Sequence, residues 1–277
     1  MIARRNRVFL WAGPVIVLSW LTLAVLDPDP GGGISETLGL GYFLGSLFGH
    51  ATLAAAWAAF GPAPPIWRIP LSLIWVAMLA IAIGINVALN GGPDDAPLVL
   101  GICLLGQWLL LQIPFSGLAI GFRLQLRGTE AAEESFDPRH WQFGIRQLII
   151  ITAIVSVVFG IGRLVVPLVA GLSQGEEPIF VFLMLAAIVL TLPLLLAALM
   201  RRMALPGVLL VLALIGAASA VELPLLQSFH RGPGPAAIDL IVINAFTAAT
   251  ILIVALVVRF NGLCLGKVRP RAVGTTP

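Results

Sequence analysis

The chain has 277 residues, of which 59% are hydrophobic and 10% are charged, and its formal net charge is +3. An ordinary soluble domain is about 45–50% apolar and about 25% charged, so this chain has too few polar residues to cover a soluble globule. Its 16 basic residues are scattered singly or in pairs along the chain and form no basic patch for nucleic acid.

Eight runs are long and apolar enough to cross a bilayer, because a spanning helix needs about 20 mostly apolar residues. Turn sequences rich in Pro and Gly, such as 27–33 and 61–65, separate them. The sequence therefore predicts an all-α integral membrane protein, a bundle of eight transmembrane helices. The runs are 8–26, 37–60, 67–89, 97–121, 144–166, 179–200, 205–226 and 237–258.

The distribution of Lys and Arg predicts the orientation of the bundle. With the N-terminus inside, 14 of the 16 basic residues fall on the inner side, and only Arg163 and Arg231 fall on the outer side. Basic residues concentrate in cytoplasmic loops. We therefore expect a cell (inner) membrane protein with both termini in the cytoplasm.

The longest polar stretch divides the chain into two groups of four spans. We expect a first membrane half at 1–122, an acidic cytoplasmic loop at 123–142, a second membrane half at 143–266 and a cytoplasmic tail at 267–277. The loop ends either as an interfacial helix, for which Asp137-Pro138 is a good start, or as a plain solvated linker.

A tandem duplication is one interpretation of this division. The fourth and eighth runs both end with Arg beside Phe and Gly. Because four is an even number of crossings, such repeats would be parallel. The alternative is two unrelated halves, since the two halves share little sequence.

The segment Trp141-Gln142-Phe143-Gly144-Ile145-Arg146-Gln147-Leu148-Ile149-Ile150 resembles a segment of uncharacterised multipass inner-membrane proteins of planctomycete bacteria. The resemblance covers short stretches only. It implies an inner-membrane location and does not imply any particular activity.

Gly41, Gly45 and Gly49 form a stripe along one face of the second run. Residues four apart share a helix face, and small residues let another helix backbone approach closely inside a membrane. We interpret the stripe as a helix-packing surface; a close approach to a ligand is the alternative.

Several polar residues lie within the apolar runs, where polar groups are costly and are functional candidates. His50 has Ser46 one turn before it, and further candidates are Gln107, Gln112 and Asn244. One interpretation is hydrogen bonding between helices, worth roughly 0.6–2 kcal/mol. The other is a proton relay or a substrate site.

Arg163 lies near the outer end of the fifth run, on the same face as Ser156 and Gly160, which are helix-packing candidates. Glu222 and Asp239 fall at a similar depth on the seventh and eighth runs. Three roles stay open for Arg163: snorkelling to lipid headgroups, an ion pair with one of these acids, or an anion site.

Enzyme-like patterns carry little weight. Residues 171–175 match G-x-S-x-G, but they form a short loop where a nucleophile elbow needs a strand, a turn and a helix. Glu133-Glu134 with Arg139 has the wrong spacing for an intramembrane prenyl-type protease. The three histidines fall at three different depths, so we expect no metal site and no cofactor.

The sequence thus predicts a non-enzymatic structural or partner-binding membrane component. The alternative is a small-solute transporter, or permease, with polar residues lining a path between the two halves; an intramembrane hydrolase is a much weaker third. The expected partners are the lipid bilayer and further copies or other proteins joined through small-residue helix faces, with no nucleic acid.

Overall fold

The structure is a computed structural model. It describes residues 34–90, 96–128 and 236–267, together with residues 21–22 and short helical pieces between residues 187 and 224. The predicted span 144–166 and nearly all of 8–26 lie outside the described residues, and 179–200 and 205–226 are described only in part.

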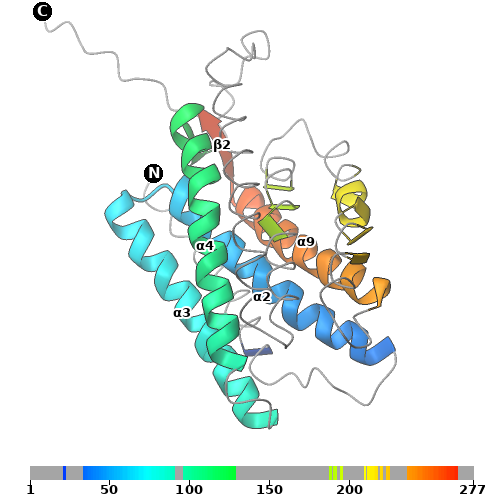
Figure 1. The fold of residues 1–277 in the computed structure, drawn as a ribbon. Coiled ribbons are helices and arrows are strands. Elements are labelled where there is room, and N and C mark those ends of the chain that lie inside the picture. Colours follow the sequence, from blue (N-terminus) through cyan, green and yellow to red (C-terminus); the bar gives the residue numbers. More distant parts are fainter. Residues whose placement is uncertain are drawn as a thin grey trace, which may run out of the picture.

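Four long helices dominate the part of the chain that the structure describes (Figure 1). They are α2 (Ile34–Phe60), α3 (Pro65–Asn90), α4 (Ala96–Gly121) and α9 (Ala237–Phe260). All four are long and apolar enough to cross a membrane. Each begins and ends within three residues of a predicted run, which confirms the helical membrane character expected from the sequence.

Helix α2 is the central helix of the described bundle. It packs against α9, α4 and α3, and 94% of its most apolar stretch is buried, compared with 33% for α3. Helix α3 lies at the side of the bundle (Figure 1) and leaves large apolar side chains such as Ile66, Ile74 and Ile81 exposed. This outer face suits lipid, because lipid tails are as apolar as these side chains.

Local chemistry fixes the turn between α2 and α3. Helix α2 stops at Phe60, before Gly61-Pro62, and α3 starts at Pro65, where proline is tolerated in a first helical turn. The Arg68 guanidinium reaches back from α3: its Nη1 donates to the carbonyl of Ala59 at 3.0 Å and to that of Gly61 at 2.7 Å. These bonds satisfy carbonyls that a helix end leaves free.

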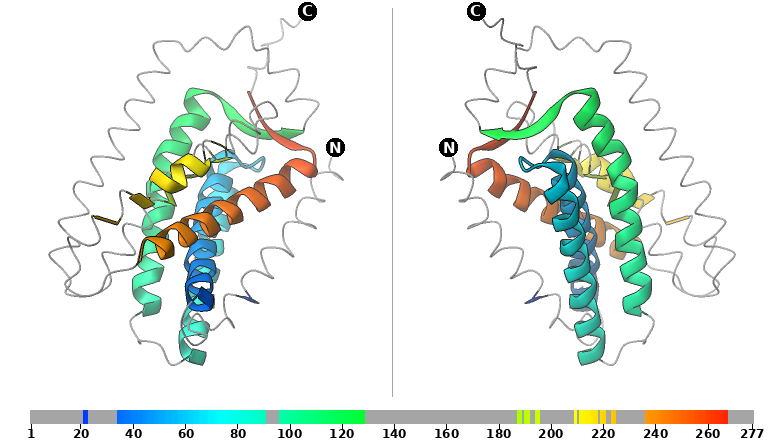
Figure 2. Two further views of the ribbon diagram at one scale, coloured as in Figure 1. Left: turned by 90° about the vertical axis from the view of Figure 1, so that its right-hand side faces the viewer. Right: turned by 90° about the vertical axis from the view of Figure 1, so that its left-hand side faces the viewer.

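The structure also contains a two-stranded sheet that the sequence analysis did not predict. Strand β1 (Leu124–Gly128) follows α4 directly, strand β2 (Leu263–Lys267) follows α9, and the two pair antiparallel with Leu126 opposite Leu265. Figure 2 shows the strand pair bridging the ends of α4 and α9. The polar stretch expected as loop from residue 123 therefore begins with a strand.

Helices α2 and α9 run in the same direction. Near their first turns, Thr37 Oγ1 donates to Asp239 Oδ1 at 2.8 Å, and both helices end at the level of the sheet, where α2 contacts β1 and α9 leads into β2. Among the described residues every Lys and Arg belongs to the sheet end, while the acids Glu36 and Asp239 lie at the other end. The basic residues are Arg68, Arg123, Arg127, Arg259 and Lys267.

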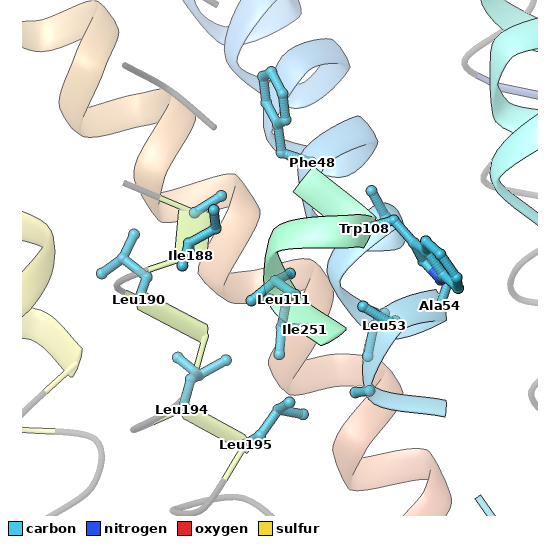
Figure 3. Packing of buried hydrophobic residues seen from close by; sticks show 14 of the residues in the cluster. Phe48, Leu53, Ala54, Trp108, Leu111, Ile188, Leu190, Leu194, Leu195 and Ile251 are labelled. Carbon is cyan, nitrogen blue, oxygen red and sulfur yellow. The ribbon is translucent and has the colours of Figure 1, made fainter. Parts of the chain in front are cut away.

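One apolar core joins residues from both halves of the chain. Phe48 of α2, Leu111 of α4 and Ile251 of α9 belong to the same buried cluster as Ile188 and Leu194. Figure 3 shows these side chains gathered between the helices. The two halves therefore share a core.

Candidate functional site

The glycine stripe of α2 faces α9. A Cβ atom built on Gly45 would lie 2.6 Å from the carbonyl oxygen of Ile243 and 2.6 Å from Cβ of Phe246. One built on Gly49 would lie 2.9 Å from Cβ of Thr250, and one on Gly41 would meet Val242. Since α9 occupies the whole stripe, the close approach along this face is made by a helix.

Three polar side chains form a cluster in the middle of the bundle: Gln107 of α4, Thr52 of α2, and Thr191. All three are fully buried, at 0% exposure. Gln107 Nε2 donates to Thr52 Oγ1 at 2.8 Å and to the Phe48 carbonyl at 3.0 Å. The hydroxyl oxygens of Thr52 and Thr191 lie 3.3 Å apart.

The hydrogens of this Gln107–Thr52–Thr191 cluster can be counted. A threonine hydroxyl carries one hydrogen and an amide nitrogen carries two. The Thr191 hydroxyl also contacts the carbonyl of Ala187, so a complete chain runs from Gln107 to Thr52, from Thr52 to Thr191, and from Thr191 to Ala187. Within the described residues this leaves Gln107 Oε1 as the cluster's buried side-chain atom without a hydrogen-bond partner.

His50 lies on the opposite face of α2 from this cluster. At about 100° per residue, position 50 is two residues, and therefore about 160° around the helix, from both position 48 and position 52. Its ring stands 6.3 Å from the Trp75 ring of α3 at an angle of 48°. The structure therefore does not bring His50 and Gln107 together.

The His50 side chain is 1% exposed, and neither ring nitrogen has a hydrogen-bond partner in the part of the chain that the structure describes. The ring is hydrogen-bonded to neither Ser46 nor Gln107. Ser46 Oγ instead lies 3.5 Å from Thr250 Oγ1 on α9. An unpartnered buried polar group costs about 1–3 kcal/mol, which makes His50 a candidate for a function other than packing.

The remaining intramembrane candidates bond to neighbouring helices. Gln112 Nε2 donates to the Ala55 carbonyl at 3.2 Å, which adds a third hydrogen bond from α4 to α2. Asn244 Nδ2 donates to Ser219 Oγ at 3.0 Å. Asp239 accepts from Thr37 and also from its own helix start, the backbone N–H of Ala236, at 2.9 Å.

Arg163, which the sequence suggested as an ion-pair partner of Glu222 or Asp239, lies outside the described residues. Glu222, Ser156 and Gly160 lie outside them too. The ion pair expected for Arg163 therefore stays a prediction. Within the described residues no group of three or more His, Cys, Asp or Glu side chains gathers where a metal could bind.

Three residues that matter in the structure were missed in the sequence. In the sequence, Thr52 and Thr191 look like ordinary threonines in the middle of a span, whose hydroxyls can bond to a carbonyl of their own helix. Arg68 begins a span and looks like an ordinary membrane-end arginine. Only the pairing of helices shows that these side chains join separate segments.

Comparisons of the chain with protein-family profiles, with curated proteins and with solved structures find no match.

Proposed function

We propose that the chain crosses the inner membrane eight times, with both termini in the cytoplasm. The basic residues at the sheet end and the acids at the opposite end support this orientation, because basic residues favour the cytoplasmic side. Reporter fusions at residue 277 and in loop 90–96 test it. Signals from opposite sides of the membrane support the arrangement, and signals from the same side overturn it.

Within this arrangement we propose a non-enzymatic structural or partner-binding membrane component. The Gln107–Thr52–Thr191 cluster carries the proposal. It joins three helical segments, including two from different halves of the chain, by direct hydrogen bonds between fully buried side chains. Inside a membrane such bonds hold helices together, at about 0.6 to 2 kcal/mol each. The glycine contact between α2 and α9 adds close packing to the same central helix.

Removal of the cluster's hydroxyls tests this role. Thr52→Val keeps the shape of the side chain and removes a hydrogen bond between helices, so the melting temperature of the purified protein in detergent should fall. Thr247→Val is the matched control, because the Thr247 hydroxyl is equally buried but donates to Ile243 of its own helix at 2.9 Å. Equal melting temperatures for the two variants would contradict a joining role.

A carrier for a small polar solute is the second candidate, and His50 favours it. A buried imidazole has one donor and one acceptor to offer, and both ring nitrogens are without partners in the described residues. In transporters, substrate sites lie near the bilayer midplane, and His50 lies midway along α2.

Flux into proteoliposomes decides between the two candidates. Vesicles with an entrapped pH dye report proton entry, and vesicle swelling reports the entry of glycerol or urea. A carrier should raise one of these rates above that of empty vesicles, and His50→Phe should abolish the increase without loss of folded protein. Rates equal to those of empty vesicles for all three probes exclude a carrier for them and favour the structural role.

A further inference from the structure

The segments that follow α4 and α9 have the same structure. Each helix is followed by a residue with positive φ, Arg123 at 55° and Gly262 at 79°, and then by a strand that begins Leu-x-Leu. A positive φ is uncommon for a residue other than glycine, so its presence at Arg123 marks a turn that the fold requires. Leu124 and Leu263, the first residues of the two strands, are 139 residues apart.

The strand pairing relates these equivalent positions to each other. Leu126 and Leu265 are again 139 residues apart, and they lie directly opposite one another at the centre of the ladder. On either side of this central pair, Leu124 pairs with Lys267, and Leu263 pairs with Gly128. An exchange of the two strands therefore maps the ladder onto itself, which is the property of a two-fold axis through the central pair.

A second contact between equivalent residues lies in the membrane interior. Thr52 and Thr191 are also 139 residues apart, and their hydroxyl oxygens are 3.3 Å from each other. Two equivalent residues can touch each other only near a symmetry axis. Since Thr52 lies inside the helix bundle and Leu126 lies beyond its end, the two contacts define a line along the bundle.

The exposure pattern repeats at the same interval. Residues 72–78 of α3 are buried, exposed, exposed, half-buried, buried, exposed and exposed in turn, and residues 211–217 show the same order position by position. A shift of the comparison by one helical turn along α3 breaks the match, so helical periodicity alone does not produce it.

Helices α4 and α9 repeat as well, at an interval of 140. Residues 110–117 and 250–257 share one order of buried, half-buried and exposed positions. The chain contains one more residue after α4 than after α9: residues 118–123 lie between the matching part of α4 and β1, whereas only residues 258–262 lie between the matching part of α9 and β2.

We infer that the chain consists of two tandem copies of one four-span unit, which dock on each other through a self-complementary surface around a two-fold axis between Thr52/Thr191 and Leu126/Leu265. The inference rests on the eight-span arrangement proposed above. Each half is thus the partner of the other, as in a two-fold homodimer in which the same patch on both subunits makes the contact. The axis runs along the membrane normal, as four spans per copy require.

The axis predicts contacts that can be tested. Gly49 of α2 meets Thr250 of α9, and the equivalents of these residues are Ile188 and Leu110. Both belong to or pack against the shared core, and Figure 3 shows Ile188 in that core with Leu111 of α4. The two copies should therefore place Ile188 against Leu110.

Distances between surface labels test the symmetry in the full chain. The exposed residues Leu73 and Ile238 have the exposed equivalents Leu212 and Leu98. Spin labels on the pair 73/238 and on the pair 212/98, with Cys103 and Cys264 replaced by alanine, should give the same mean distance by pulsed electron resonance. Distance distributions that do not overlap would overturn the two-fold relation.

A cross-linking experiment gives the second readout. Thr52→Cys with Thr191→Cys, and Ile188→Cys with Leu110→Cys, should both cross-link with a short thiosulfonate reagent. Ile188→Cys with Leu109→Cys should not, because Leu109 is exposed on the outer face of α4. If the 52/191 pair cross-links but the 188/110 pair reacts no more than the 188/109 pair, the two halves touch without being related by the two-fold axis. The reporter fusions fail separately if the span count is wrong, so the two proposals can be told apart.

Discussion

Replacement of Gly45 by alanine tests how closely α2 and α9 pack. The added Cβ would lie 2.6 Å from the Ile243 carbonyl oxygen, 2.6 Å from Cβ of Phe246 and 2.8 Å from the backbone nitrogen of Thr247. Two of these three atoms belong to the α9 backbone, so no side-chain rotation relieves the clash. Ordinary contacts between heavy atoms are about 3.5–4.0 Å, and the helices must therefore separate by about 1 Å.

The expected loss of stability follows from two opposing terms. Alanine is favoured over glycine within a helix by about 1 kcal/mol. Overpacking costs typically about 1–3 kcal/mol, and a clash with backbone belongs at the upper end of that range. The net destabilisation for Gly45→Ala should be about 2 kcal/mol, and Gly45→Leu should leave little folded protein.

Gly84 in α3 provides the matched control, because a Cβ built there meets no atom within 4 Å. Gly84→Ala should keep the helix gain of about 1 kcal/mol, and Gly49→Ala should fall between the two because its nearest contacts are side-chain carbons of Thr250. Unfolding in mixed detergent micelles measures all three. A Gly45→Ala protein as stable as Gly84→Ala would show that α2 and α9 do not meet along the stripe.

Substitutions at three further positions have defined outcomes, at Gln107 and Arg163 in the same unfolding assay and at Arg68 by hydrogen exchange. Gln107→Leu removes two bonds from α4 to α2 and should cost about 1–4 kcal/mol; an unchanged stability would show that the cluster does not join the helices. Arg68→Leu should speed hydrogen exchange at the end of α2, whereas Arg68→Lys should do so less, because Arg68 Nη1 holds two carbonyls there. Arg163→Ala should destabilise the protein, and neutralisation of its true partner, Glu222 or Asp239, should restore part of the loss because no lone buried charge is left behind; no recovery with either partner would favour snorkelling.

The conformations at Arg123 and Gly262 illustrate what sequence patterns leave out. The Leu-x-Leu strands are five residues each, too short for a periodic pattern, and the pairing partner of β1 lies in the other half of the chain. A hydropathy window evaluates one stretch of sequence at a time, so residues 124–128 were predicted to be a loop. The similar ends of the fourth and eighth runs were visible in the sequence, but the pairing between them was not.

Hydropathy alone determined where the described spans lie, because burial of a backbone in lipid requires about 20 apolar residues in a row and this demand is local. The four-residue spacing of Gly41, Gly45 and Gly49 likewise predicted a packing face. The sequence does not indicate which helix occupies that face. It also does not show that His50 and Gln107 lie on opposite sides of α2, or that Thr52 contacts Thr191. In a helix that is apolar on every side the sequence does not mark an inner face, so only the packing of neighbouring helices decides which polar atoms meet.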